Sequence, residues 1–345
     1  MPRMLELTPH LIGDYLAAEV DGWRKVSVIR MDRLPLGASR ETYRIDAEVS
    51  DASGATRNEK LILRRDPPAS HVDSDRLTEF ESYRAIYGRG IPVPRMIHLE
   101  TDPERLGGAV SIAEDLRGFH NSEYQLQQPA WAKFRPALAQ QMWTYMGKLA
   151  AIDTAGLGLE KFMPPATVKN ASRLQFEQWR DKFRRDSDTC DPILDAVIRE
   201  LQRTCPASAK LSMVHGDFRA GNFLYDDAGV IRAILDWEMA HIGDPHEDLA
   251  WSLSRVFSFG KDDRRSGLAL KEEAISWWEE GAGFKVDRAT LRWYELFTDL
   301  KAQALWTSAV KVWKTSENRD VILAYASWWL QNAQNKAMLE TMGRL

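Results

Sequence analysis

The chain of 345 residues is 44% hydrophobic and 28% charged, as is usual for a globular protein, and its net charge of −4 does not point to nucleic acid or an anionic membrane. No apolar run approaches the roughly 18 residues that a membrane span needs, and the N-terminal stretch lacks an apolar signal segment. The two cysteines, Cys190 and Cys205, have no CxxC or Cys/His partner. We therefore expect a cytoplasmic protein with reduced thiols.

The first part of the chain is predicted to form a small sheet with helices beside it. Thr8 as N-cap and Pro9 at the first helical position begin a helix. Residues 26–66 alternate as strands do, with a hairpin turn at 51–54 (DASG). The segment SDRLTEFESYRAIYGRG has its apolar residues at helical spacing, and IPVP then forces extended chain. With the short strand in GGAVSIAEDLRG, these elements predict a first domain over residues 1–115.

Beyond Leu116 the sequence becomes mainly helical. Apolar residues recur at helical spacing over the segments 129–153, 172–185, 192–204, 245–258, 287–315 and 319–341. One β island interrupts them at 211–236. Strands and helices in separate blocks indicate an α+β protein with two domains, 1–115 and 116–345.

The β island holds the most informative stretch, VHGDFRAGNFLYDDAGVIRAILDWE. FLY, DDAG and VIRAIL read as strand, turn and strand. A hairpin brings its two ends to the same edge, so Asn222 and Asp236 are predicted to be neighbours in space. Their oxygens are the hard ligands that Mg²⁺ prefers, in particular for a metal shared with nucleotide phosphates. Asp217, on the loop that enters the hairpin, can accept a hydroxyl proton there.

The spacing H-x-D-x-x-x-x-N, followed by a strand pair and an Asp, is that of a kinase catalytic loop. Together with Asp236-Trp237-Glu238 and GDPHEDLAW at 243–251, it makes the sequence similar to the aminoglycoside phosphotransferase/choline kinase-like family. The resemblance implies a protein kinase-like two-lobed fold, with a small β-rich N-lobe and a larger, mainly helical C-lobe. It also implies ATP or GTP as co-substrate and Mg²⁺ as cofactor.

Four further residues of this region are predicted to support the site. His215 is expected to fix the loop by hydrogen bonds, and Asp244 and Asp248 to hold the local architecture. Asp244-Pro245-His246-Glu247 has the pattern of a capping box that opens a helix. Glu238 is left open, as a residue that can help a metal through water.

In the first domain, LPLGASRETYRI resembles the nucleotide loop of the family, with Gly37 allowing close backbone approach and Ser39 able to donate to a phosphate. In LILRRD, alternation points Arg64 and Arg65 to opposite sides. The family pattern places Arg64 on the phosphates and Arg65 outside. Because the family usually has Lys or Arg there and the two are not interchangeable, a catalytically weak enzyme or a pseudo-enzyme remains an alternative.

The resemblance assigns three more acidic residues to nucleotide binding. Glu79, on the helix after this strand, is the acid that pairs with the phosphate-binding cation, and Glu81 is the alternative. Glu114 and Asp115 fall where the family linker presents backbone groups to adenine.

The last third of the chain is predicted to contain the acceptor pocket. Its many Trp residues lie at helical spacing and are expected to be mostly core: Trp277, Trp278, Trp293, Trp306, Trp313, Trp328 and Trp329. Residues 281–345 hold nine Lys/Arg and six Asp/Glu, a balance of +3, which disfavours a polycationic aminoglycoside or choline. Similarity to phosphotransferase domains joined or adjacent to acyl-CoA dehydrogenases implies a hydroxyacyl-CoA or a similar hydroxy acid.

Three functions follow from these patterns. The favoured one is a small-molecule kinase for an anionic or apolar hydroxyl acceptor, and an aminoglycoside-type or other antibiotic kinase is an alternative with the same chemistry. A nucleotide-binding pseudokinase that acts as an interaction module is the second. A protein kinase is disfavoured because no A-P-E segment follows Asp236. The sequence leaves the acceptor, the choice of ATP or GTP, and the oligomeric state open.

Overall fold

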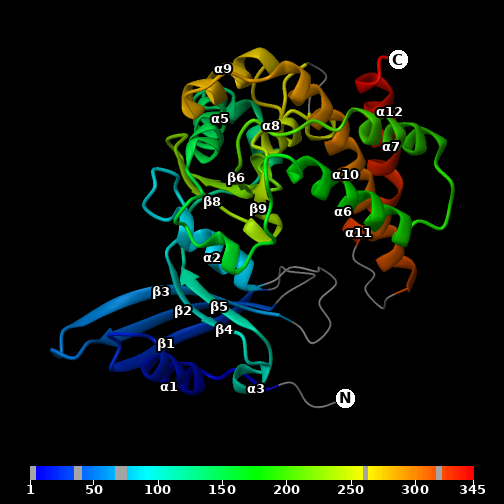
Figure 1. Cartoon of the computed structure of the whole chain (residues 1–345). Helices are drawn as coiled ribbons and strands as arrows, with labels where there is room; N and C mark the ends of the chain where they lie inside the picture. Colours follow the sequence, from blue (N-terminus) through cyan, green and yellow to red (C-terminus); the bar gives the residue numbers. More distant parts are fainter. Residues whose placement is uncertain (1–4, 35–40, 67–75, 259–262, 316–320) are drawn as a thin grey trace. The chain divides into compact units, whose positions relative to one another are not determined.

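A computed structural model describes residues 5–34, 41–66, 76–258, 263–315 and 321–345. The chain forms two compact units, Met1–Phe119 and His120–Leu345. The first is a sheet with helices and the second is mainly helical (Figure 1). The sequence had placed this boundary just before Leu116.

The first unit is built on a five-stranded sheet in the order β1-β2-β3-β5-β4, in which every neighbouring pair is antiparallel. Its elements are α1 (Pro9–Glu19), β1 (Lys25–Leu34), β2 (Glu41–Ser50), β3 (Thr56–Arg65), α2 (Arg76–Ile86), β4 (Met96–Glu100), α3 (Pro103–Leu106) and β5 (Val110–Glu114). α1 packs against β1, while α2 contacts β4 and β5.

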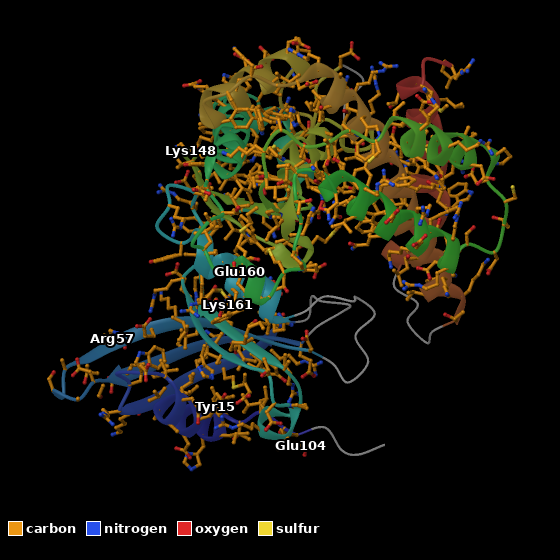
Figure 2. The ribbon with its side chains drawn as sticks, in the orientation of Figure 1. Tyr15, Arg57, Glu104, Lys148, Glu160 and Lys161 are labelled. Atoms are coloured by element: carbon orange, nitrogen blue, oxygen red, sulfur yellow. The ribbon has the colours of Figure 1, made fainter. Side chains whose placement is uncertain are left out.

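Helix α1 begins where the sequence predicts. The Thr8 hydroxyl accepts a hydrogen bond from the Leu11 amide (3.2 Å), and Pro9 takes a position where no amide donor is needed. The buried side of the helix joins the core of the sheet, where Tyr15 (labelled in Figure 2) donates to Glu100 Oε2 at 2.6 Å. The hydroxyl thus satisfies a carboxylate that is itself buried.

The second unit surrounds two small two-stranded sheets, β6–β9 and β7–β8, with helices. Its main elements are α4 (Glu123–Leu126), α5 (Arg135–Ala151), α6 (Ala171–Asp186), α7 (Pro192–Thr204), β6 (Ser212–Val214), β7 (Phe223–Tyr225), β8 (Ile231–Ile234), β9 (His241–Gly243), α8 (His246–Ser252), α9 (Lys271–Ala282), α10 (Arg288–Thr315), α11 (Val321–Tyr325) and α12 (Gln331–Thr341). The long helix α10 packs against α6, α7, α8 and α12 (Figure 1).

Two predictions about these helices are wrong in detail. The helix expected over 245–258 ends at Ser252 and is followed by a separate 3₁₀ turn, Arg255–Phe257. Trp328 and Trp329 are not core residues, since 72% and 56% of their surfaces are exposed. They lie in a single π-helical stretch, Ala326–Leu330, which widens the helical turn between α11 and α12.

Helices α5 and α9 cross at two glycines. A Cβ on Gly147 would lie 2.1 Å from the Trp278 carbonyl oxygen, and a Cβ on Gly281 would lie 2.3 Å from the Thr144 carbonyl oxygen. The two backbones therefore approach each other more closely than any side chain allows.

We expect Gly147→Ala to lower the free energy of unfolding by about 1–3 kcal/mol, because the added methyl group forces the two helices apart. Urea unfolding would measure it. Gln140→Ala, at an exposed position of the same helix α5, is the control and should change stability little. Equal stabilities of the wild-type protein and the Gly147 variant would show that the crossing relaxes without cost.

None of the helices in the described ranges combines the length and the hydropathy that a membrane crossing requires.

Candidate active site

The hairpin of β7 and β8 brings the two predicted metal ligands to one end. Phe223 pairs with Ile234, and the Leu235 amide donates to the Asn222 carbonyl at 2.7 Å. Asn222 therefore stands directly before β7 and Asp236 two residues after the end of β8, next to each other at the same end of the hairpin. This is the arrangement that the spacing of the hairpin predicts.

The Asp217 carboxylate is held on both of its oxygens. Oδ2 accepts from Asn222 Nδ2 (2.7 Å), and Oδ1 accepts from the Trp251 indole nitrogen (2.6 Å). The side chain keeps 19% of its surface exposed. The carboxylate is thus oriented by its neighbours and still partly exposed.

His215 is completely buried, and its two ring nitrogens have different roles. Nδ1 accepts from the Asp217 amide (3.1 Å), so Nε2 carries the proton and donates to the Leu235 carbonyl at 2.9 Å. The ring is neutral in this arrangement, and burial lowers its pKa to about 4. His215 thus joins the loop that carries Asp217 to the hairpin by hydrogen bonds, as its position in the motif predicts.

This buried ring makes stability depend on pH. In the unfolded chain the imidazole takes up its proton near pH 6.5, whereas in the folded protein it does so only near pH 4. Between these two values the unfolded state binds more protons, so the free energy of unfolding falls as the pH is lowered. We expect the stability difference between wild type and His215→Gln to shrink from about pH 7 to about pH 4. Urea unfolding would measure both proteins, and a stability difference that stays constant from pH 7 to pH 4 would contradict this expectation.

Asp248 accepts two backbone amides of the catalytic loop, from His215 (2.7 Å) and from Gly216 (2.8 Å). Its burial raises its pKa to about 6. Gly216 has a φ of +86°, and a Cβ there would lie 2.5 Å from the Met239 carbonyl oxygen, so only glycine fits. Asp248 has the geometry of the supporting role predicted for it.

The predicted capping box at Asp244 does not form. Asp244 Oδ1 does accept from the His246 amide (2.9 Å) and lies 2.7 Å from His246 Nδ1. The Glu247 side chain, however, does not reach back to cap the helix; it contacts Lys301 Nζ (2.8 Å) and His241 Nε2 (3.2 Å). A fully buried carboxylate is stabilised more by two cationic partners than by one amide, and this long-range pairing overrides the local pattern.

The end of the hairpin suits a cation that a nucleotide also binds. Asn222 uses its amide nitrogen to hold Asp217, so its amide oxygen is the atom that can face a metal. Asp236 has a φ of +72°, an uncommon conformation that turns the chain sharply at this point. In the described ranges no group of three or more His, Cys, Asp or Glu converges on a metal site. A hard cation with few protein ligands and several phosphate oxygens fits this donor set. Glu238 is the middle residue of the short 3₁₀ turn Trp237–Met239 that follows Asp236.

Arg219 and Trp251 both contact Asp217 and are not among the predicted site residues. Arg219 contacts Glu123 Oε2 (2.7 Å) and Asp217 Oδ1 (3.3 Å), and its guanidinium lies over the Phe257 ring, 5.4 Å from the centroid. Burial alone would lower the pKa of Arg219, but Asp217, Glu123 and Asp236 together hold it above its ordinary value. Arg219 lies inside the H-x-D-x-x-x-x-N motif, two residues after Asp217, and that position is a signal that could have been used.

In the first unit, Arg64 and Glu79 are in contact as expected, with Nη1 3.2 Å from Oε1. Glu79 also pairs with Arg76 (3.1 Å), which in turn pairs with Asp66. The alternative acid, Glu81, pairs instead with Arg84 at the surface. Glu79 is therefore the acid that holds the predicted phosphate cation.

Arg65 points to the opposite side of the strand, as predicted, but it is not outside the fold. It is buried, pairs with Glu41, and donates to the carbonyls of Leu5 (2.7 Å) and Leu106 (3.0 Å). The sheet face that receives it is covered by neighbouring chain, so an unpaired arginine there would be costly. Sequence alternation distinguishes the two faces but does not show which one is covered.

The predicted linker residues have structural side chains. Glu114 accepts from the Arg95 amide (2.7 Å), and Asp115 pairs with Arg44 (2.9 Å) and with Arg117. Their contribution to nucleotide binding thus remains a proposal about their backbone groups. Gly37 and Ser39 lie outside the described residues.

Comparison with known proteins gives the family. Residues 31–294 match the model of the phosphotransferase enzyme family, which is most of the chain. Curated relatives include acyl-CoA dehydrogenase family member 11 of Rattus norvegicus, 26% identical over 64% of this chain and 29% of that protein. Another is the probable acyl-CoA dehydrogenase IBR3 of Arabidopsis thaliana, 24% identical over 83% of this chain. The chain spans only 37% of that protein, and thus little more than a third, or less, of each of these two relatives.

Solved structures share the fold. A proposed aminoglycoside phosphotransferase from Ralstonia eutropha JMP134 superposes with a TM-score of 0.76, at 18% identity, and the match covers 98% of this chain and 99% of that one. A choline/ethanolamine kinase family protein from Mesorhizobium loti gives a TM-score of 0.58 at 17% identity, covering 98% and 97%. The sequence-based prediction of an ATP-dependent phosphotransferase is confirmed at the level of the family. The chain therefore belongs to the phosphotransferase enzyme family and has the protein kinase-like fold that its motifs predict.

Proposed function

We propose that this protein is a small-molecule kinase that transfers the γ-phosphate of ATP to a hydroxyl group, with Asp217 as the base. The observation that carries this proposal is the Asp217 carboxylate itself. It is fixed by Asn222 and Trp251, partly exposed, and placed at the hairpin end where Asn222 and Asp236 meet. Solved relatives described as complexes with ADP or ATP support the choice of nucleotide.

Each residue of the site has a separate task in this mechanism. Asp217 accepts the proton of the acceptor hydroxyl as the oxygen attacks the γ-phosphate, whose bond to the β-phosphate oxygen breaks and releases ADP. Asn222 and Trp251 keep the carboxylate oriented for that transfer. Asn222 and Asp236 would hold Mg²⁺, which when bound neutralises the charge of the phosphates.

Nucleotide binding is proposed for the first unit. Arg64 would contact the phosphates, since its guanidinium offers several N–H donors in a planar fork. Glu79 and Arg76 hold it in place through the chain of ion pairs described above. With Arg64 in this role we expect the nucleotide to bind and to be turned over. The pseudokinase alternative predicts instead that the nucleotide binds without turnover.

The acceptor is proposed to be an anionic or apolar alcohol such as a hydroxyacyl-CoA. The relatives named acyl-CoA dehydrogenases support this choice. So does Glu123, a carboxylate beside the catalytic loop that is already neutralised by Arg219 and therefore not ready to bind an ammonium group. The charge balance of residues 281–345 is weaker support, because several of its cations pair with acids outside that window: Glu247, Asp186, Asp188, Glu272 and Glu279.

A comparison of acceptors tests this proposal. Turnover with ATP and Mg²⁺ would be measured for a kanamycin-like amine, choline and a 4-hydroxyacyl-CoA at equal concentration. We expect the hydroxyacyl thioester to be phosphorylated and the amines to react poorly, because a polycation desolvated without carboxylate partners is costly. Efficient turnover of the amine would favour the antibiotic kinase instead.

A further inference from the structure

Lys301 of helix α10 is a buried lysine whose ammonium group reaches the catalytic loop. Only 1% of its side chain is exposed. Nζ donates to the Gly216 carbonyl at 2.5 Å and to Glu247 Oε1 at 2.8 Å. It also lies over the Trp251 ring, 5.0 Å from the centroid. A charge so deeply buried is tolerated only with close partners of this kind.

Glu247 shares its other oxygen with a second cation. Oε2 lies 3.2 Å from His241 Nε2, and His241 Nδ1 lies 3.0 Å from the Met239 carbonyl. Both ring nitrogens therefore face acceptors, so both carry a proton and the imidazole is charged. Burial acts to lower the pKa of His241, but Glu247 outweighs it and the pKa is raised. Lys301, Glu247 and His241 form one buried charge network.

This network contacts the two segments that hold the proposed base, Asp217, and the proposed metal ligand, Asp236. The Gly216 carbonyl belongs to the peptide directly before Asp217, and the Met239 carbonyl lies three residues after Asp236. The amide of that same Gly216–Asp217 peptide donates to His215 Nδ1. The peptide plane is thus pinned at its oxygen by Lys301 and at its N–H by His215.

Lys301 is also connected to Asp217 through the indole ring of Trp251. Trp251 packs its ring against the Lys301 ammonium and donates its N–H to Asp217 Oδ1. Lys301 therefore holds the peptide before Asp217 directly, and it contacts the indole that holds the Asp217 side chain.

We propose that Lys301 is a positioning residue of the phosphotransferase site, which fixes the peptide before Asp217 and so sets the orientation of the base. The proposal rests on the assignment of Asp217 as the base. A buried ion pair is a weak source of stability, since apolar replacements of similar volume are often neutral. Its expected contribution is therefore to geometry and turnover more than to folding.

Two variants test this inference. Lys301→Met removes the ammonium group, and Lys301→Met/Glu247→Gln removes both charges, so that no unpaired buried carboxylate remains to hinder folding. Lys311→Met is the matched control, because Lys311 lies on the same helix α10 with 44% of its side chain exposed, and its partner Asp186 keeps Lys182, Arg185 and Ser308 as further partners. Amide hydrogen exchange over residues 212–218 would be measured first, since it requires no acceptor.

We expect both Lys301 variants to exchange faster in this segment, and the control to match wild type. Once an alcohol that the wild-type protein phosphorylates is known, kcat of both Lys301 variants should fall by about 10²-fold while KM for ATP stays unchanged. The reason is that a small displacement of a positioned group affects the transition state most. The double variant decides the matter if the single one does not fold.

A folded double variant with wild-type exchange and wild-type kcat would overturn the proposal. So would a parallel loss of kcat and of ATP binding, which indicates general damage to the fold. If the wild-type protein phosphorylates no alcohol, the proposed function fails, whereas the exchange comparison still decides whether Lys301 holds the loop.

Discussion

Asp217→Asn is expected to lower turnover by roughly 10²–10⁴-fold, the range that a general base contributes. The amide has nearly the same shape as the carboxylate but cannot accept the hydroxyl proton. Nucleotide binding should stay close to wild type, because Asp217 is not one of the proposed metal ligands. Calorimetric titration with Mg²⁺–ATP and a steady-state assay would measure the two quantities separately.

The control for this variant is Asp227→Asn. Asp227 lies in the turn of the same hairpin with 92% of its side chain exposed, far along the strands from Asn222 and Asp236. The Asp227→Asn variant should therefore retain full activity. If Asp217→Asn instead abolished ATP binding while turnover per bound nucleotide survived, Asp217 would be a binding residue and its assignment as base would be wrong.

Asp236→Ala is expected to weaken the binding of Mg²⁺–ATP and to abolish most turnover, because a charged metal ligand is lost. The backbone conformation at this position complicates an alanine, since its φ of +72° favours Asn and Asp among residues with a side chain. Asp236→Asn keeps that conformation and one oxygen ligand, and should therefore be intermediate. The dependence of nucleotide affinity on Mg²⁺ concentration would be compared for both variants.

Two outcomes separate the explanations of such a loss. If Asp236→Asn behaved like wild type and Asp236→Ala did not, the effect would come from the backbone and not from metal binding. If neither variant changed the Mg²⁺ dependence, Asp236 would not be a metal ligand.

The hairpin of β7 and β8, with its proposed metal ligands, could be predicted because its information is local. Asn222 and Asp236 are joined by two short strands and a turn, so the sequence spacing alone brings them together. The same is true of the hydrogen bond between Asn222 and Asp217, which are five residues apart. Family resemblance then supplied the roles that spacing alone leaves open.

The buried charge network could not be predicted, because its partners are far apart in the sequence. Lys301 meets Gly216 and Glu247 across 85 and 54 residues. The residues around Glu247 in the sequence predict a helix cap, and only the tertiary contact with Lys301 shows what Glu247 binds. Helical periodicity likewise places Trp328 on an apolar face of its helix, but it does not show that this face stays exposed to solvent.

The most direct test of the central claim is a single-turnover reaction with ATP labelled in its γ-phosphate, Mg²⁺ and a hydroxylated acceptor, with every phosphorylated product identified by mass spectrometry. For the wild-type protein we predict one phosphorylated alcohol for each ADP formed, and for Asp217→Asn almost none despite bound nucleotide. Tight ATP binding by the wild-type protein without any labelled alcohol, across hydroxyacyl thioesters, amino sugars and choline, would contradict the account and favour a pseudokinase.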